Sequence, residues 1–150
     1  MSKVTLRELP DGTLERTVLP PDTDDLLAHL ADKAWQVETS GTVVNGVRLP
    51  TSREHRSALK DARDMLRDGE LLDTQGHVLT TMDVTIGNVG MPGVTAEVAT
   101  QMLMAIGRHV QACFALRQAL LAAIQNGIVT TFEQIEAPET VGLSSWPSNV

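Results

Sequence analysis

TAEVATQMLMAIGRHVQACFALRQALLAAIQN, residues 95–126, is the stretch of sequence that decides the fold of this chain. It contains no proline, one internal glycine (Gly107) and mainly strong helix formers. Thr95 suits the N-cap of a helix, and Gly127 suits the position just past its end. We therefore predict one helix over residues 95–126, well beyond the mean helix length of about 11–12 residues.

The apolar residues of this helix recur three and four positions apart, as they do in helices that face a partner helix. Two interpretations stay open. Either the helix is buried against the chain's own short elements, or it forms a seam between copies of the chain. The second interpretation, with a solitary tryptophan near the C-terminus added as a docking residue, predicts an interface. Its residues are Leu103, Ile106, Val110, Cys113, Phe114, Leu120, Ile124 and Trp146.

The N-terminal part of the chain predicts a hairpin followed by a short helix. Residues 3–19 alternate loosely between apolar and polar on both sides of Asp11-Gly12, a pair that favours tight hairpin turns. Pro20-Pro21 ends this hairpin. Residues 22–35 begin with capping and acidic residues and place leucines at helical spacing, so we predict a short amphipathic helix there.

The middle of the chain predicts small sheets and a second short helix. From Gln36 the apolar period is two, and Ser40-Gly41 and Asn45-Gly46 are turn signals, so we predict a small antiparallel meander. Thr51 and Glu54 fit a capping box that opens a helix ended by Gly69.

The segment after Gly69 predicts another hairpin, which turns at Gln75-Gly76. GNVGMPG, residues 87–93, predicts a flexible or tightly turning connector to the long helix. After the long helix, Thr131 and Gln134 fit a capping box for one helical turn.

Together these elements predict an α+β fold with short antiparallel hairpins, two short helices and one long C-terminal helix. We expect this fold to be oligomeric through a helical bundle or a coiled-coil seam. The predicted organisation is an N-terminal hairpin arm (1–21), an α+β domain (22–137) and a C-terminal docking tail (138–150).

Composition narrows the class of protein. The chain has 150 residues and a formal charge of −7, which argues against a nonspecific nucleic-acid surface. Its one cysteine cannot form an intrachain disulfide. The first residues lack the apolar run of a signal peptide, and no stretch reaches the roughly 18 apolar residues of a membrane span. We expect a soluble protein made in a cytoplasm.

The sequence contains no recognised catalytic or metal-binding motif. His29, His55, His77 and His109 lie on different predicted elements without the spacing of a helical metal site, and no phosphate-binding loop is present. Cys113 lies one helical turn after His109, which would suit a nucleophile and a base. A thiol on an apolar stripe without an activating charge is usually inert, however. We therefore expect no enzyme, no metal and no cofactor.

Two segments carry a resemblance to a known family. Residues 31–59, with Val44-Asn45-Gly46 and with Thr51 before Glu54, and residues 107–124, with the run HVQACF, resemble a domain of unknown function. This domain recurs in bacteriophage and prophage tail-fibre and tail-fibre-associated proteins. The resemblance covers about two thirds of the chain. The present sequence departs from the family pattern in the inserted GNVGMPG, and the family implies no catalytic residues.

The resemblance implies a structural component of a phage tail, associated with tail fibres or the baseplate and acting in fibre attachment or host adsorption. The implied location is the virion, after synthesis in the bacterial host cytoplasm. Implied partners are tail-fibre or baseplate proteins and further copies of the chain, with a trimer favoured and a dimer possible. Two alternatives stay open: a tail-fibre assembly chaperone, and a small phage-encoded regulator that binds and inhibits a host protein.

Overall fold

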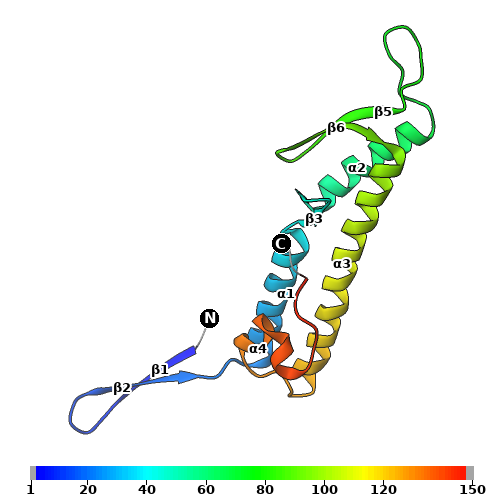
Figure 1. Ribbon diagram of the computed structural model, residues 1–150. Coiled ribbons are helices and arrows are strands. Elements are labelled where there is room, and N and C mark those ends of the chain that lie inside the picture. The colour runs from blue at the N-terminus through cyan, green and yellow to red at the C-terminus, as the bar shows by residue number, and fades with distance from the viewer. Residues whose placement is uncertain (1–2, 148–150) are drawn as a thin grey trace. The chain divides into compact units, whose positions relative to one another are not determined.

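The computed structural model describes residues 3–147 and has an α+β fold with short antiparallel hairpins and one long helix, as predicted (Figure 1). The elements are, in order, β1 (Lys3–Glu8), β2 (Leu14–Leu19), α1 (Thr23–Thr39), β3 (Thr42–Val44), β4 (Val47–Leu49), α2 (Arg53–Arg67), β5 (Thr81–Ile86), β6 (Val89–Thr95), α3 (Ala96–Gln125), α4 (Phe132–Glu136) and the 3-10 helix η1 (Pro138–Val141). The chain divides into two compact units. Unit 1 holds the described residues up to Trp35 together with Phe114–Trp146, and unit 2 is built mainly from Gln36–Cys113.

The six strands form three separate two-stranded antiparallel sheets: β1 with β2, β3 with β4, and β5 with β6. The first hairpin turns at Asp11-Gly12 as predicted, because Asp11 accepts hydrogen bonds from the backbone and hydroxyl of Thr13, and Gly12 has φ +84°. These bonds, the hydroxyl of Thr13 first, also lower the pKa of the Asp11 carboxyl. The second hairpin turns at Asn45-Gly46, where both residues have positive φ, as tight hairpin turns require.

The third hairpin corrects a prediction. GNVGMPG is not a connector, because Gly87-Asn88 forms the turn between β5 and β6 and the rest of the segment lies in β6. The strand tolerates its glycines because the register shifts between Met82 and Val84, and Asp83 accepts a hydrogen bond from the Gly93 backbone at 3.0 Å. The hairpin predicted at Gln75-Gly76 is reduced to one isolated bridge between Leu72 and Val78.

Two further predictions about helix ends are wrong. Helix α1 continues to Thr39, so Gln36–Thr39 is helical and the predicted meander has only its two later strands. The residue before α2 that caps its first turn is Ser52, whose hydroxyl accepts from the His55 backbone. Thr51 is fully buried and bonds elsewhere. In both cases hydrogen bonds to residues distant in the sequence determine the structure, in place of the local sequence pattern from which we predicted it.

The long helix α3 agrees with its prediction at both ends. The Thr95 hydroxyl accepts a hydrogen bond from the Val98 backbone at 3.1 Å, as an N-cap does. At the other end Gly127 has φ +73° and donates to Ile124, while Ile128 donates to Ala123. This pair of bonds is the Schellman motif, which ends a helix by satisfying its last carbonyl groups.

Each unit has its own hydrophobic core. In unit 2, α2, β5, β6 and the first part of α3 surround apolar side chains that are buried together, and these elements lie side by side in Figure 1. These residues are Leu49, Leu59, Ala62, Val84, Ile86, Met91, Val94, Ala99, Ile106 and Val110. In unit 1, α1, the last part of α3 and α4 bury a second set. Its residues are Leu26, Leu30, Leu116, Leu120, Ala123, Ile124, Val129 and Ile135.

The segment after α4 is packed against unit 1 and is not a free docking tail up to Trp146. Pro138 is buried, and Leu143 and Trp146 pack against the core of the unit. The indole of Trp146 donates to the Ile135 carbonyl at 2.8 Å. Residues 148–150 of the predicted tail lie outside the described residues. Within residues 3–147, no helix is long and apolar enough to cross a membrane.

Candidate functional site

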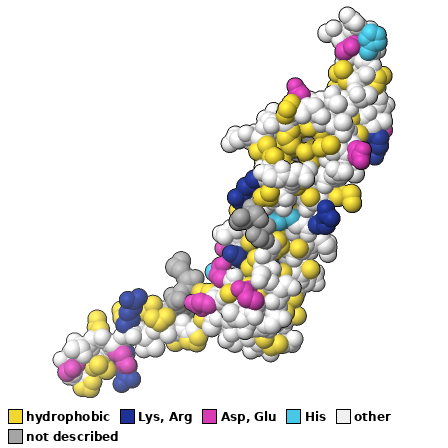
Figure 2. Space-filling view, viewed as in Figure 1, with side chains coloured by type: hydrophobic (Ala, Val, Ile, Leu, Met, Phe, Trp, Pro, Cys, Tyr) yellow, Lys and Arg dark blue, Asp and Glu magenta, His cyan; other side chains and the backbone are white. Residues whose placement is uncertain are grey.

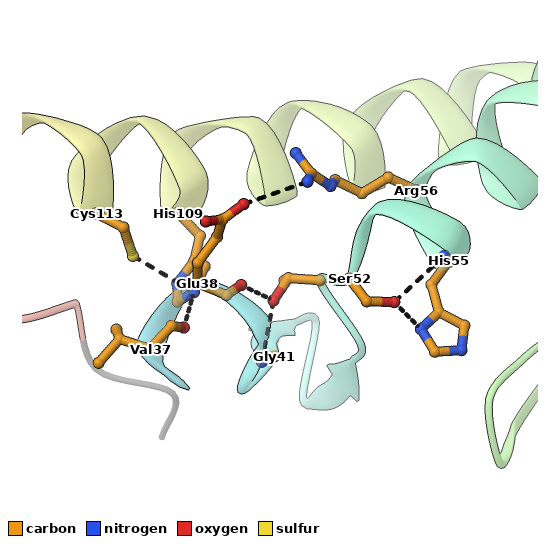
Figure 3. Close-up of polar contacts among 9 residues, drawn as sticks. Val37, Glu38, Gly41, Ser52, His55, Arg56, His109 and Cys113 are labelled. Atoms are coloured by element: carbon orange, nitrogen blue, oxygen red, sulfur yellow. Dashed lines mark hydrogen bonds and ion pairs between the residues drawn. The ribbon is translucent and has the colours of Figure 1, made fainter. Parts of the chain in front are cut away.

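The densest group of polar contacts in unit 2 surrounds the C-terminal end of α1, and we call it the polar junction: Val37, Glu38, Ser40, Thr51 and His109. The last carbonyl groups of a helix have no partner within the helix. Here the Val37 carbonyl accepts from the Ser40 hydroxyl and from Nε2 of His109, both at 2.8 Å. The Thr51 hydroxyl donates to the Glu38 carbonyl and accepts from the Gly41 backbone. The polar junction therefore caps α1 and joins it to α3 and to the start of α2 (Figure 3).

His109 of the polar junction lies beside Cys113, and these two residues are the pair considered as base and nucleophile. Nε2 of His109 lies 3.9 Å from the Cys113 sulfur. That same nitrogen bonds the Val37 carbonyl, and because a carbonyl only accepts, Nε2 must carry the hydrogen. It therefore has no lone pair to take a proton from the thiol. Burial, followed by the charge of Glu38, raises the pKa of Cys113 to about 11. The geometry keeps the thiol protonated and unreactive.

A partly buried ion pair lies beside this thiol. Nη2 of Arg56, from α2, approaches Oε1 of Glu38 at 3.4 Å, and both side chains are mostly covered (Figure 3). Nε of Arg56 is buried without a hydrogen-bond partner among the described residues. Unpaired buried donors and long ion pairs contribute little or cost stability, so this pair positions α2 without making it rigid. Within residues 3–147, no group of three histidine, cysteine or acidic side chains is placed to hold a metal ion.

The predicted interface residues of α3 are mostly inside the chain's own cores. Ile106, Val110 and Cys113 are buried in unit 2, with Leu103 half-buried against the same core. Leu120 and Ile124 are buried in unit 1. Their spacing is the spacing of any helix with one covered face, so the chain covers this stripe without a second copy.

One predicted interface residue of α3 stays accessible: Phe114 is 44% exposed. Leu121, seven residues later and therefore on nearly the same side of the helix, is 39% exposed. This pair is an apolar surface that α3 leaves open in unit 1, and Met104 of the same helix is 59% exposed in unit 2. Sequence periodicity placed Phe114 among the core-facing residues because the apolar stripe is wide.

The larger exposed apolar surface lies on the first hairpin, which the sequence predicts as an N-terminal docking arm, although its apolar residues are not among the predicted interface residues. All side chains of Val4–Glu8 and Leu14–Leu19 are exposed. The register places Val4 opposite Val18, and Leu6 and Leu14 lie on the same side as this pair. We call these four residues the hairpin face: Val4, Leu6, Leu14 and Val18 are 42%, 66%, 65% and 57% exposed. Thr5 and Thr17, which pair with each other, lie on the opposite side.

The hairpin face could have been found from the alternation of residues 3–19, which predicts one apolar side. Only the structure shows that none of residues 3–147 covers it. Figure 2 shows the result, with apolar and charged side chains interspersed over the hairpin surface.

The comparisons with known proteins identify the family. Residues 22–140 match the family model described as "Domain of unknown function (DUF4376)", and the chain belongs to this family. The matched residues begin after the first hairpin. No match was found among curated proteins or among solved structures.

Proposed function

We propose that this member of the DUF4376 family is a structural component of a bacteriophage tail, and that it docks on a neighbouring tail-fibre or baseplate protein through its hairpin face. The tail context rests on the resemblance of residues 31–59 and 107–124. The observation that carries the docking role is the hairpin face, with its four apolar side chains open to solvent. The fold supports binding through a surface, since its buried polar groups are used to cap helices.

The first hairpin needs a partner for a physical reason. A two-stranded hairpin is marginally stable in water unless its apolar side packs on something. Fully burying one aliphatic side chain is worth about 1.5–3 kcal/mol, so four such side chains supply a substantial driving force for docking. In addition, β1 and β2 each pair on one side only among the described residues. Their free edges can add strands from a partner.

The proposal includes assembly of the chain with itself, with a trimer favoured because tail fibres are commonly threefold. We place the contact between copies at Phe114 and Leu121, since the remaining predicted residues of α3 are already covered by the chain. Two exposed apolar side chains are a small contact on their own. Stable assembly therefore also requires the contacts that each copy makes with the fibre or baseplate protein.

A paired variant tests the docking role. Leu6→Asp with Leu14→Asp puts charge on the hairpin face, whereas Thr5→Asp with Thr17→Asp puts the same charge on the opposite side of the same strands. We expect the first variant to lose co-purification with tail structures from phage-producing bacteria by at least about tenfold, because buried unpaired charge is costly. The matched control should retain it. Equal recovery of both variants would contradict docking through the hairpin face.

The inventory of purified particles tests the tail assignment separately. Mass spectrometry should find the chain in intact virions at a fixed ratio to tail proteins. Its presence in assembly intermediates but not in virions would replace the structural role with that of an assembly chaperone. Recovery with a host protein and with no tail protein would favour a regulator of that host protein.

Sedimentation tests the contact between copies. Phe114→Asp should lower the measured mass to that of one chain. Ala112→Asp is the control, because residue 112 is also exposed but lies on roughly the opposite side of α3. A single-chain mass for the unmodified protein at high concentration would remove self-assembly from the proposal.

A further inference from the structure

A second surface feature belongs to unit 2. It is a cleft of about 440 Å³ between the end of β4, the first turn of α2 and the β5–β6 turn. Its volume lies in the range of small-ligand sites, about 300–1,000 Å³. The residues that line it are Thr39, Ser40, Arg48, Leu49, Pro50, His55, Gly87, Asn88 and Val89.

The imidazole of His55 presents its Nε2 to this cleft. Its Nδ1 is bonded to the Ser52 hydroxyl. When this hydroxyl donates to Nδ1, or when the ring is charged, Nε2 carries a hydrogen that can be donated to an anion. Nε2 is the ring atom nearest to Gly87, and a Cβ built at residue 87 would lie 3.5 Å from it. Figure 3 shows this nitrogen directed away from Ser52. The glycine at 87 thus leaves room beside this nitrogen, which has no hydrogen-bond partner among the described residues.

Arg48 supplies the positive charge of the cleft. Its Nη2 donates to the Ser40 carbonyl at 2.8 Å, which holds the guanidinium in place. The group has five N–H donors in a planar fork that suits carboxylate and phosphate, so donors remain for a ligand. The side-chain amide of Asn88 lies at the same rim.

The charge of this cleft is opposite to that of the chain. The protein carries 19 acidic residues and a formal charge of −7. Yet none of the described residues lining the cleft is acidic, while one is an arginine and one a histidine. The remaining lining residues include Pro50 and Val89, which are partly exposed and can cover an apolar group.

We propose that this cleft binds an oxyanion, a carboxylate or a phosphate, through Arg48, His55 and Asn88. Pro50 and Val89 contact the apolar part of a ligand that carries one. This inference does not depend on the tail assignment, and it gives unit 2 a ligand site that is separate from the docking surface of unit 1.

The test is a titration of the full chain followed by the backbone amide signals of His55, Gly87 and Asn88 in NMR spectra at constant ionic strength. The probes are inorganic phosphate, isovalerate as an aliphatic carboxylate, and isovaleramide as its neutral counterpart. We expect saturable shifts with at least one of the two anions and none with the amide. Saturation by phosphate alone identifies a phosphate site, and saturation by isovalerate alone identifies a carboxylate site. Absence of saturation with both anions would overturn the proposal.

A pair of variants locates the binding. Asn88→Asp adds a negative charge at the cleft with almost no change in shape, and Asn45→Asp adds the same charge at the β3–β4 turn, outside the residues that line the cleft. Like charges a few ångströms apart near a protein surface repel enough to weaken anion binding about tenfold. We expect that loss only for Asn88→Asp, with unchanged signals elsewhere in unit 2. Equal affinity in both variants would place the anion elsewhere and refute the assignment.

Discussion

The β5–β6 hairpin and the β1–β2 hairpin have the same architecture, but the apolar side of the first is buried and that of the second is exposed. Each has two antiparallel strands with apolar residues on one side. In β5–β6 those residues, Val84, Ile86, Met91 and Val94, are buried under α2 and α3. In β1–β2 the corresponding side stays in solvent. Alternation in a sequence therefore predicts that a strand has an apolar side, but it does not tell which polypeptide will cover that side.

The largest expected difference between the two hairpins is in stability. Ile86→Ala removes a fully buried side chain and leaves a cavity, so we expect a loss of about 2–5 kcal/mol in the free energy of unfolding. Leu6→Ala, on the hairpin face, should change that free energy by less than about 0.5 kcal/mol in the isolated chain. Urea denaturation followed by circular dichroism measures both. Similar losses for the two variants would break the comparison.

The buried thiol of Cys113, elsewhere in unit 2, should also be closed to reagents. The pKa of Cys113 is raised from 9.0 to about 11, which lowers the thiolate fraction at pH 8 about a hundredfold. We expect a disulfide reagent to label the native thiol at least about a hundredfold more slowly than the thiol of the chain in urea. Labelling of the native protein at the unfolded rate would show that unit 2 opens readily or that the thiol is activated.

The β3–β4 hairpin is an intermediate case, since polar contacts hold it. Thr51→Val keeps the shape of the side chain but leaves the Glu38 carbonyl and the Gly41 backbone N–H without their partner. We expect a loss of about 1–3 kcal/mol in the free energy of unfolding. Thr85→Val, an exposed position on β5, is the control and should have almost no effect. Equal stability of both variants would show that the polar junction does not hold this hairpin.

The smallest expected effect on stability comes from a contact in unit 1, the unit that contains the first hairpin. In unit 1, Glu136 bonds Lys33 at 2.7 Å and His29 at 2.9 Å. Burial raises the pKa of the Glu136 carboxyl, but the hydrogen bonds from Lys33 and His29 outweigh it and lower the pKa below 4.5. A lowered pKa means that the contact stabilises the fold above pH 4.5, and that this stabilisation is lost as the pH falls through the folded-state value.

Glu136→Gln should therefore reduce stability at pH 7 by less than about 1 kcal/mol, because the Glu136 side chain is 47% exposed and solvent screens the contact. The difference from the unmodified chain should shrink below pH 4.5. Thermal unfolding at pH 7 and pH 3.5 measures it. A difference that grows toward pH 3.5 would have the wrong sign for this contact.

Local signals in the sequence predicted much of the fold. The turns at Asp11-Gly12 and Asn45-Gly46, the capping box of Thr131 and the ends of α3 depend on contacts within a few residues, and each is confirmed. The predictions of a strand at Gln36–Thr39 and of an N-cap at Thr51 were wrong because long-range contacts determine the structure there. There His109, 72 residues from Val37, and a threonine from the next loop complete the end of α1.

The exposed surfaces of the molecule were harder to predict from the sequence than its helices and strands. The hairpin face follows from alternation, but its exposure is a property of the whole chain. The cleft gathers Arg48, His55 and Asn88 from three elements, and no spacing in the sequence joins them. The heptad-like spacing of α3 could not distinguish a seam from a core, because both require the same periodic covered side.

The sharing of α3 between the units has a consequence for how the chain folds. The helix gives Ile106 and Val110 to one core and Leu120 and Ile124 to the other. The second half, Phe114–Gln125, falls within the length of about 12–15 residues below which isolated helices are marginal in water. This half is thus formed with the help of the first half, Ala96–Cys113. The two units should gain and lose structure as a single cooperative event, with the slowest amide hydrogen exchange near the middle of the helix.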